Sequence, residues 1–350
     1  MGVTLKMLAE RTGFSTATIS RVLNNDPTMS VGEETRRMIL QAAQELGYTG
    51  SSGRRAQKTK SDTKTIAIVE MMSPEEQMAD PFFLYLKNFV EHVCREKKIQ
   101  TVTLAKNSSG YHAIFSTPID GIIAIGYFSD KEIAAMQLVC ENITFLDSSP
   151  DELRFDSVVI NFDLGIRQAI DSLYQKKHTR IGFIGPKMLQ DDRRHLAEEP
   201  RRRFFEHYMR KLRLFRSEYM VNAPLRNRLQ MEQEFQLSMK SWSEEQRPTA
   251  FITVNEECAI GAVHVLREMK LKIPEDVSII SFNDTVMSSV IEPRLTSISA
   301  HLEYMAAAAV QLVTQRIATP THKAERVYPQ KIVIPPELIE RDSTATAKER

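Results

Sequence analysis

The sequence predicts an N-terminal all-α helix-turn-helix domain followed by an α/β core of two lobes, each built on a parallel, doubly wound sheet. Three observations support this fold class. Residues 4–24, TLKMLAERTGFSTATISRVLN, carry two helical apolar stripes on either side of Gly13. From Thr65 onward, short apolar runs typical of strands alternate with helical segments, and that rhythm occurs twice. A chain of 350 residues has room for one small domain and two lobes.

The first helix is predicted to begin after Thr4, whose hydroxyl suits an N-cap, and to end at Gly13. Ser15 is predicted to cap the second helix. One apolar stripe joins the two helices: Leu5, Leu8 and Ala9 on the first, and Ile19, Val22 and Leu23 on the second. A third amphipathic helix is expected to complete a small core, with Val31, Thr35, Met38, Ile39, Ala42, Ala43 and Leu46 on its stripe.

The second helix leaves Thr16, Ala17, Ser20 and Arg21 facing outward. Small polar residues at the start of a helix let its backbone approach base edges, and Arg21 has the reach to meet a phosphate or a guanine. The pattern therefore favours a DNA recognition helix. The alternative is an ordinary helical hairpin of an all-α domain, which has the same pattern of apolar residues.

The stretch after Tyr48 is rich in Gly, Ser, Thr and Lys and buries too little apolar surface to fold alone. It is interpreted as a hinge, residues 49–63, with an ordinary solvated tether as the alternative. Charge is uneven along the chain. Residues 1–60 hold nine Lys and Arg against five Asp and Glu, whereas the remainder holds 37 against 40. A basic head on a slightly acidic body is typical of a protein whose head alone meets phosphates.

The three cysteines, Cys94, Cys140 and Cys258, form no CxxC pair and have no histidine at metal-ligand spacing. We expect core thiols in a reducing compartment, and neither a metal nor a cofactor. No apolar N-terminal segment and no run of about eighteen apolar residues occurs. The sequence therefore predicts a cytoplasmic protein without a membrane segment.

The core is predicted from its alternation of strands and helices. Strands are expected at residues 66–72, 99–105, 120–126, 143–147, 157–162, 180–185, 250–254 and 277–283. Helices are expected at residues 82–96, 131–140, 165–176, 204–214 and 259–270, with a last one within residues 295–317.

Ligands of open α/β sheets bind beyond the carboxyl ends of the strands. Four polar residues follow predicted strands: Asp147, Asn255, Asn283 and Asp284. Their carboxylates and amides suit sugar hydroxyls. The alternative for each is a helix cap or a turn.

Several motifs in order resemble a full-length repressor of the lactose/galactose repressor (LacI/GalR) family. They are TLKMLAERTGFSTATISRVLN, EETRRMILQAAQELGY, PTAFITVNEECAIGAVHVLREMKLKIPEDVSIISFND, EPRLTSI and ELIERDS. The NNDPTMSVGEETR segment and the lack of a terminal zipper look most like the galactose and galactoside repressors. The resemblance implies a periplasmic-binding-protein-like core, a homodimer on a palindromic double-stranded operator, and a small carbohydrate effector.

The resemblance also implies domain boundaries. The headpiece is expected at residues 1–48, the hinge at 49–63, the core at 64–343 and a frayed tail at 344–350. Within the core, one lobe is expected to comprise residues 64–160 and 298–328, and the other residues 161–297 and 329–343.

The site residues implied by the resemblance fall into two sets. The DNA-binding set is Thr4, Ser15, Thr16, Ala17, Thr18, Ser20, Arg21, Asn24, Tyr48, Arg54 and Arg55. The effector-binding set is Phe82, Phe83, Asp147, Arg201, Asn255 and Asn283. Where relatives place a ligand-stacking aromatic, only Leu229 aligns. Where they place a leucine that wedges into the minor groove, this chain has Ala56, with Gly53 nearby, so hinge contacts are expected to be mainly electrostatic.

Two further alternatives stay open. Within this family, the effector could be a protein or a phosphorylated corepressor. Outside it, the chain could be a sugar-binding transport protein, which would need an export signal and no basic N-terminal domain. An enzyme is not expected, because GxGxxG and GxxxxGK[ST] are absent and the eight histidines are scattered.

Overall fold

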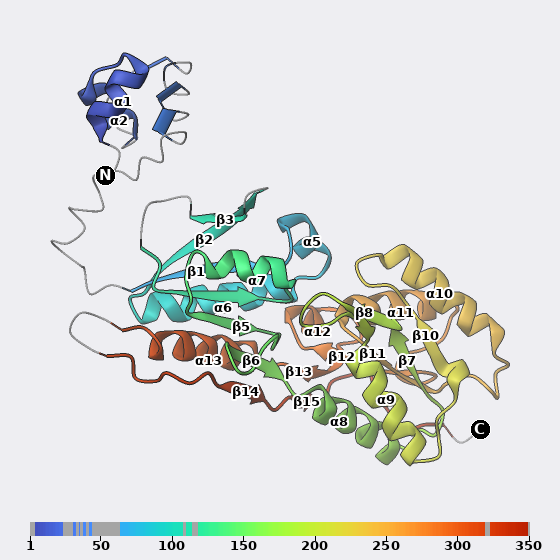
Figure 1. Cartoon of the computed structure of the whole chain (residues 1–350). Helices are drawn as coiled ribbons and strands as arrows, with labels where there is room; N and C mark the ends of the chain where they lie inside the picture. The colour runs from blue at the N-terminus through green and yellow to red at the C-terminus, as the bar shows by residue number, and fades with distance from the viewer. Residues whose placement is uncertain are drawn as a thin grey trace. The chain divides into compact units, whose positions relative to one another are not determined.

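The computed structural model describes residues 4–23, 31–32, 35, 38–39, 42–43, 64–107, 110–113, 118–318 and 323–348 (Figure 1). The chain forms two compact units, Met1–Thr63 and Lys64–Arg350. The expected boundary between headpiece and hinge, at residue 48, lies outside the described residues. Within the described residues, no helix is both long enough and apolar enough to cross a bilayer.

In the first unit, helix α1 spans Leu5–Thr12 and helix α2 spans Thr16–Leu23. Residues 35, 38–39 and 42–43 are also helical. The side chains at the centre of this unit come from all three segments: Leu8, Ile19, Val22, Ile39, Ala42 and Ala43. Met38, which was placed on the buried stripe, is instead 49% exposed. Three short helical segments thus share one core, as the apolar spacing predicted.

The first lobe of the second unit is built on a seven-stranded sheet in the order β14-β6-β5-β4-β1-β2-β3. Its strands are β1 Thr65–Glu70, β2 Gln100–Asn107, β3 Gly110–Ala113, β4 Gly121–Ile125, β5 Ile143–Leu146, β6 Asp156–Ile160 and β14 Lys331–Ile334. Every pairing is parallel except that of β2 with β3. The central strands β1, β4 and β5 are buried on both faces, as expected for parallel strands covered by helices.

Helices cover both faces of this sheet. On one face, α6 (Phe82–Glu96) packs beside α13 (Leu302–Gln315), and both contribute to one apolar cluster. On the other face, Ile133 and Met136 of α7 (Asp130–Gln137) join a second cluster. Short helix α5 (Pro74–Ala79) precedes α6.

The second lobe is built on a six-stranded sheet in the order β10-β7-β11-β12-β13-β15. Its strands are β7 Ile181–Gly185, β10 Met220–Asn222, β11 Ala250–Thr253, β12 Ser278–Asn283, β13 Thr296–Ser299 and β15 Glu337–Ile339. Within this sheet, β13 and β15 pair antiparallel and all other neighbours pair parallel. A separate two-stranded hairpin joins β8 (Met188–Gln190) to β9 (Leu196–Glu198).

Two pairs of helices flank the second sheet (Figure 1). Helix α8 (Phe162–Gln175) packs on α9 (Pro200–Lys211), and α10 (Arg228–Ser241) packs on α11 (Glu256–Glu268). Short helix α12 (Val286–Val290) and one 3₁₀ turn, Ser217–Tyr219, complete the lobe. The elements that were not predicted are the helices α5, α10 and α12, the hairpin, and the strands β3, β10, β13, β14 and β15. Most of them are too short to show a periodic apolar pattern. Helix α10 was overlooked although Met231, Phe235 and Met239 lie at helical spacing and are buried.

The chain passes between the lobes three times: after β6, between β13 and α13, and between β14 and β15. The expected assignment of residues 329–343 to the second lobe is therefore wrong for β14, which pairs with β6 of the first lobe. Pro335 and Pro336 interrupt the ladder after β14, and the chain crosses there. Residues 298–299, expected in the first lobe, end β13 in the second.

The tail was expected to be frayed from residue 344, but residues 344–348 are not frayed. The backbone N–H of Ala345 donates to Ser278 Oγ at 3.1 Å, and that of Ala347 donates to the Lys176 carbonyl at 2.8 Å. The imidazole Nε2 of His178 lies 2.9 Å from the Ala345 carbonyl oxygen. These contacts hold residues 345–348 on the second lobe. The pattern of the tail showed no such role, because its partners lie far away in the chain.

Candidate functional site

The two helices of the first unit are capped as their sequence predicts. Thr4 Oγ1 accepts from the backbone N–H of Met7, and Ser15 Oγ accepts from that of Thr18 at 3.0 Å. Gly13 adopts φ +75°, a left-handed conformation that favours glycine, and its N–H donates to the Ala9 carbonyl. The turn between the helices is therefore encoded locally.

Helix α2 presents a small, polar surface. Thr16, Ala17 and Arg21 are exposed, and Ser20 is half-buried. The Ser15 and Thr18 hydroxyls lie 2.8 Å apart, so these two predicted DNA-binding residues hydrogen-bond to each other. Ser15 also accepts the bond from the Thr18 N–H that caps the helix. The remaining members of the predicted DNA-binding set, Asn24, Tyr48, Arg54 and Arg55, lie outside the described residues, as do Gly53 and Ala56.

A cavity lies between the two lobes of the second unit. All six predicted effector-binding residues line it: Phe82, Phe83, Asp147, Arg201, Asn255 and Asn283. The other lining residues are Met71, Met72, Asp80, Tyr127, Ile160, Phe162, Leu189, Gln190, Leu225 and Arg226. They come from both lobes and mostly follow the carboxyl ends of strands, where parallel sheets leave a crevice. The cavity combines apolar walls with a few converging polar groups.

Asp147 directly follows β5 and adopts φ +72°. Its backbone N–H donates to the Val158 carbonyl, and the Tyr127 hydroxyl donates to its Oδ2 at 3.5 Å. Burial raises the pKa of Asp147 to about 7, although the charge of Arg201 opposes this shift. The carboxyl group is therefore poised between its neutral and charged forms near neutral pH.

Arg201 lies in the first turn of α9 and is held from two sides. Its Nε donates to Glu199 Oε1 at 2.7 Å, and its Nη1 donates to the Val254 carbonyl at 2.8 Å. The guanidinium also stacks over the Phe162 ring at 4.6 Å from the centroid. No described residue accepts a hydrogen bond from its Nη2, which leaves a donor for a ligand in the cavity.

Two further arginines, Arg202 and Arg203, follow Arg201 on α9. Arg203 is exposed beside the ring of Phe204. Arg202 is half-buried, and its Nη1 donates to the carbonyls of Gly185 and Val221 at 3.2 and 3.4 Å. Arg202 therefore ties α9 to the ends of β7 and β10.

Asn255 serves as the N-cap of α11, with its Oδ1 accepting from the Cys258 N–H at 3.1 Å. The capping alternative weighed from the sequence is thus correct for this residue. Its amide Nδ2 is directed to Asp80 Oδ2 of the first lobe at 3.3 Å. Burial raises the pKa of Asp80. Asn255 therefore joins the two lobes at the cavity wall.

Asn283 ends β12 at φ +92° and lines the cavity. Asp284 does not line it, because its carboxylate accepts from Arg341 Nη1 at 2.6 Å. The predicted aromatic pair begins α6, where the rings of Phe82 and Phe83 meet edge to face with centroids 5.1 Å apart. Both rings contribute to the apolar wall.

Sequence reasoning missed several cavity residues. Tyr127, Asp80 and Gln190 carry polar groups into the lining, and Phe162 supplies another ring. Tyr127 follows strand β4, a position that could have revealed it. Gln190 lies in the unpredicted hairpin, so no periodic signal pointed to it. Met71 and Met72, which follow strand β1, also line the cavity.

Leu229 does not occupy the position of a stacking residue. It is 68% exposed in the first turn of α10 and does not line the cavity, whereas Leu225, four residues earlier, does. Within the described residues, no group of three or more His, Cys, Asp or Glu side chains is arranged to hold a metal ion.

Two family models match the chain. Residues 4–51 match the model described as bacterial regulatory proteins, lacI family, and residues 170–344 match the periplasmic binding protein-like domain. The chain is 30% identical to the HTH-type transcriptional repressor MelR of Bacillus subtilis over 99% of both chains. It is also 30% identical to the regulator GanR of the same species, over 93% of this chain and 96% of GanR.

Solved structures share the fold at lower identity. A complex of the transcriptional regulator CelR with cellobiose superposes with a TM-score of 0.63 at 21% identity, covering 97% of this chain and 99% of that one. A lac repressor dimer bound to operator and an anti-inducer superposes with a TM-score of 0.62 at 20% identity, covering 99% and 100%. The family predicted from the motifs is confirmed: the chain belongs to the LacI family of bacterial regulatory proteins and is a DNA-binding transcriptional regulator.

Proposed function

We propose that this protein is a repressor of a sugar-utilisation operon and that an uncharged carbohydrate, bound in the cavity between the lobes, controls its grip on DNA. The observation that carries this proposal is the Arg201 guanidinium, which is buried at the cavity wall. Protein acceptors fix its Nε and Nη1, whereas its Nη2 has no acceptor among the described residues. A fixed guanidinium is a directional donor for neighbouring hydroxyl oxygens.

The lining suits a sugar ring. A pyranose has apolar C–H faces and a rim of hydroxyls, and the cavity offers both kinds of partner. Phe82, Phe83 and Phe162 supply apolar surface for the faces. Asp147, Asn255 and Asn283 supply acceptors and donors for the rim. This combination of aromatic walls and few polar groups is the usual composition of a small-ligand site.

The charge balance favours an uncharged effector over a phosphorylated one. Each guanidinium in the lining already faces a glutamate: Arg201 meets Glu199 at 2.7 Å, and Arg226 meets Glu76 at 3.3 Å. Asp80 and Asp147 add two carboxyl groups whose pKa values are raised by burial. A phosphate placed among them would bring further negative charge without an unpaired cation, at a large cost.

On the DNA side, the exposed residues of α2 are proposed to read the operator. Thr16 and Ala17 lie at the start of the helix, where side chains meet base edges, and Arg21 lies in its last turn. The lac repressor relative is a dimer on its operator. We propose a homodimer here too, since a twofold dimer presents two recognition helices to the two halves of a palindrome.

Sugar binding can alter DNA binding only if the sugar has different affinities for two arrangements of the core. Cavity residues come from both lobes, so a ligand that contacts both favours one lobe arrangement over another. We propose that the lobe arrangement favoured by the ligand changes the position of the headpieces, and that this change controls DNA binding.

The test is fluorescence-anisotropy binding to the DNA upstream of the protein's own gene at fixed salt. The protein is titrated with galactose, lactose, melibiose, cellobiose and galactose 1-phosphate. We expect a neutral sugar to change the DNA affinity and the sugar phosphate to have no effect. In Arg201→Lys, which keeps the charge but loses the fork, DNA binding is expected to persist and the sugar response to disappear.

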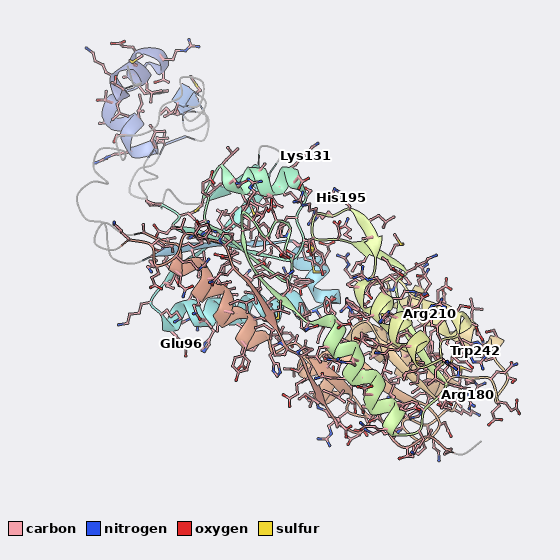
Figure 2. All side chains as sticks on the ribbon, turned by 60° about the horizontal axis from the view of Figure 1, so that its bottom comes forward. Glu96, Lys131, Arg180, His195, Arg210 and Trp242 are labelled. Atoms are coloured by element: carbon pink, nitrogen blue, oxygen red, sulfur yellow. The ribbon has the colours of Figure 1, made fainter. Side chains whose placement is uncertain are left out.

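The matched control is Arg210→Lys, an exposed arginine on the same helix (Figure 2), which should respond like the wild type. Specific DNA binding that is indifferent to every sugar but responds to galactose 1-phosphate would replace the proposal with a phosphorylated effector. The absence of specific DNA binding would overturn the repressor function itself.

A further inference from the structure

The β8–β9 hairpin belongs to the second lobe by its base. It follows β7 directly and leads into α9. The Lys187 N–H donates to Asn222 Oδ1 at 2.7 Å, and the Glu199 N–H donates to the Lys187 carbonyl at 3.2 Å. Both ends of the hairpin are therefore anchored beside the edge strand β10, in the same lobe that supplies Arg201.

Asp191 shapes the turn at the other end of the hairpin. Its Oδ1 accepts from the backbone N–H groups of Arg193 and His195 at 2.9 and 2.8 Å. Its own N–H donates to the His195 carbonyl at 2.8 Å. Arg194 takes φ +61° within this turn. The turn is thus a defined structure that aims three consecutive side chains, Asp192, Arg193 and Arg194, at the first lobe.

Arg194 makes the most extensive of these contacts. Its Nε donates to the Tyr127 carbonyl at 2.8 Å, its Nη1 to Glu132 Oε1 at 3.1 Å, and its Nη2 to the Met71 carbonyl at 3.4 Å. Figure 2 labels His195, the last residue of this turn, close to Lys131 of α7, in agreement with the bond from Arg194 to Glu132 of the same helix. One guanidinium therefore bonds to three separate segments of the first lobe.

The two residues before Arg194, Asp192 and Arg193, also contact the first lobe. Arg193 Nε donates to the Pro150 carbonyl at 2.9 Å, and its Nη groups lie 3.6 Å from Asp130 and 3.8 Å from Asp151. Burial raises the pKa of Asp192, and the nearby backbone of Ser149 opposes that shift. All of these partners belong to the first lobe, so the hairpin bridges the two lobes.

The segments that the turn grips are those that form the cavity wall. Tyr127 accepts from Arg194 through its carbonyl and donates from its hydroxyl to Asp147. Met71 accepts from Arg194 and also lines the cavity, and Ser149 lies two residues after Asp147. On the hairpin itself, Leu189 and Gln190 of β8 line the same cavity. Gln190 is exposed, and no described residue bonds to its side-chain amide, which leaves that amide available to a ligand in the cavity.

We propose that the β8–β9 hairpin is a lid over the effector cavity, in which Gln190 contacts the bound ligand and Arg194 is the positioning residue that holds the lid closed on the first lobe. This inference rests on the proposed function for the identity of the ligand as a neutral sugar. The lid explains how a cavity between two lobes retains a small solute: its contacts to the first lobe must break together before the ligand leaves.

The experiment compares full-length wild-type, Arg194→Gln and Gln190→Ala proteins by two measurements. The first is backbone hydrogen exchange of residues 188–198 without ligand. The second is calorimetric binding of galactose, lactose, melibiose and cellobiose. In Arg194→Gln we expect faster exchange confined to the hairpin, and sugar affinity weaker by about tenfold, since charge-assisted hydrogen bonds are lost. In Gln190→Ala we expect wild-type exchange with weakened sugar binding.

Arg210→Gln, which removes an exposed pair with Glu206 on the same lobe, is the control and should change neither measurement. If the hairpin of Arg194→Gln exchanges at the wild-type rate, Arg194 does not hold the hairpin on the first lobe. If the hairpin exchanges faster but sugar affinity is unchanged, the hairpin does not act as a lid over the cavity. If the wild type binds no sugar of the panel, the neutral-sugar function fails and Gln190 loses its assigned role, while the exchange comparison still decides whether Arg194 closes the hairpin.

Discussion

The Nε of Arg201 donates to Oε1 of Glu199, two residues earlier in the chain, at 2.7 Å. The other oxygen of this fully buried carboxylate accepts from the Arg202 N–H and caps helix α9. Burial lowers the pKa of Arg201, but the charge of Glu199 outweighs that effect and the pKa stays above its ordinary value. One glutamate thus starts the helix and orients the proposed ligand donor.

Glu199→Gln is therefore expected to weaken sugar binding by about tenfold or more, because an amide holds the guanidinium less firmly than a carboxylate. It should also lower the free energy of unfolding by roughly 3 kcal/mol, since a buried charge loses its partner. Calorimetry and urea unfolding measure the two effects. Glu206→Gln, which loses only an exposed pair on the same helix, is the control. An unchanged sugar affinity would show that Glu199 does not orient Arg201.

Asp147 is expected to make sugar binding depend on pH. Burial raises its pKa to about 7, so the carboxylate, the stronger acceptor for a hydroxyl, is lost as the pH falls from 8 to 6. Sugar affinity should fall over the same range. In Asp147→Asn the affinity should be weaker and flat with pH. A wild-type affinity that rises on acidification would contradict this role for the carboxylate.

The Asp147 carboxyl group is expected to make the stability of the protein depend on pH in the opposite direction to sugar affinity. Because its pKa in the folded protein lies above the ordinary value of 3.8, the folded state binds more protons than the unfolded state between about pH 4 and 7. Its contribution to stability therefore decreases as the pH rises through that window. Relative to the wild type, Asp147→Asn is expected to stabilise the ligand-free protein by roughly 3 kcal/mol more at pH 8 than at pH 5, because about two pH units of that window lie in this range. Thermal unfolding at a series of pH values measures the difference. Parallel profiles of stability against pH for Asp147→Asn and the wild type would rule out this contribution of Asp147.

Arg21→Ala is expected to weaken operator binding without affecting sugar binding, because Arg21 belongs to the headpiece and the cavity belongs to the core. A phosphate contact predicts that the slope of log affinity against log salt falls by about one. A guanine contact instead predicts relaxed specificity at one base pair, at a cost of about 1–3 kcal/mol. Anisotropy titrations on operator and scrambled DNA at several salt concentrations distinguish the two. Wild-type DNA affinity would exclude both contacts.

Gly13→Ala tests the turn between α1 and α2. A Cβ at this position meets no neighbouring atom within 4 Å, so the expected cost of about 1 kcal/mol comes only from the left-handed backbone. Hydrogen exchange of residues 5–23 should become faster, while that of the core stays unchanged. Gly32→Ala, a site that likewise meets no neighbouring atom and has no left-handed backbone in the structure, is a suitable comparison. Equal exchange in both variants would show that the turn is not strained by a side chain.

Local sequence patterns determined the headpiece helices and most of the core elements. The Thr4 and Ser15 caps, the Gly13 turn and the apolar stripe of α2 depend on neighbours within four residues, so they could be read from the chain. Helix α6 was predicted with its observed bounds, Phe82–Glu96, because its apolar spacing is regular over four turns. The positions of Asp147, Asn255 and Asn283 followed from their places after strands.

Tertiary structure alone decided which lobe received β14, where the tail docks, and what surrounds the cavity. These outcomes rest on contacts between residues far apart in the chain, such as β14 with β6 and Arg194 with Glu132. The hairpin has three-residue strands and no periodic apolar pattern, so nothing in its sequence distinguishes it from a loop. The chain encodes its elements through local periodicity, whereas the bridge between the lobes exists only once folding brings charged and polar groups of distant segments within hydrogen-bond distance.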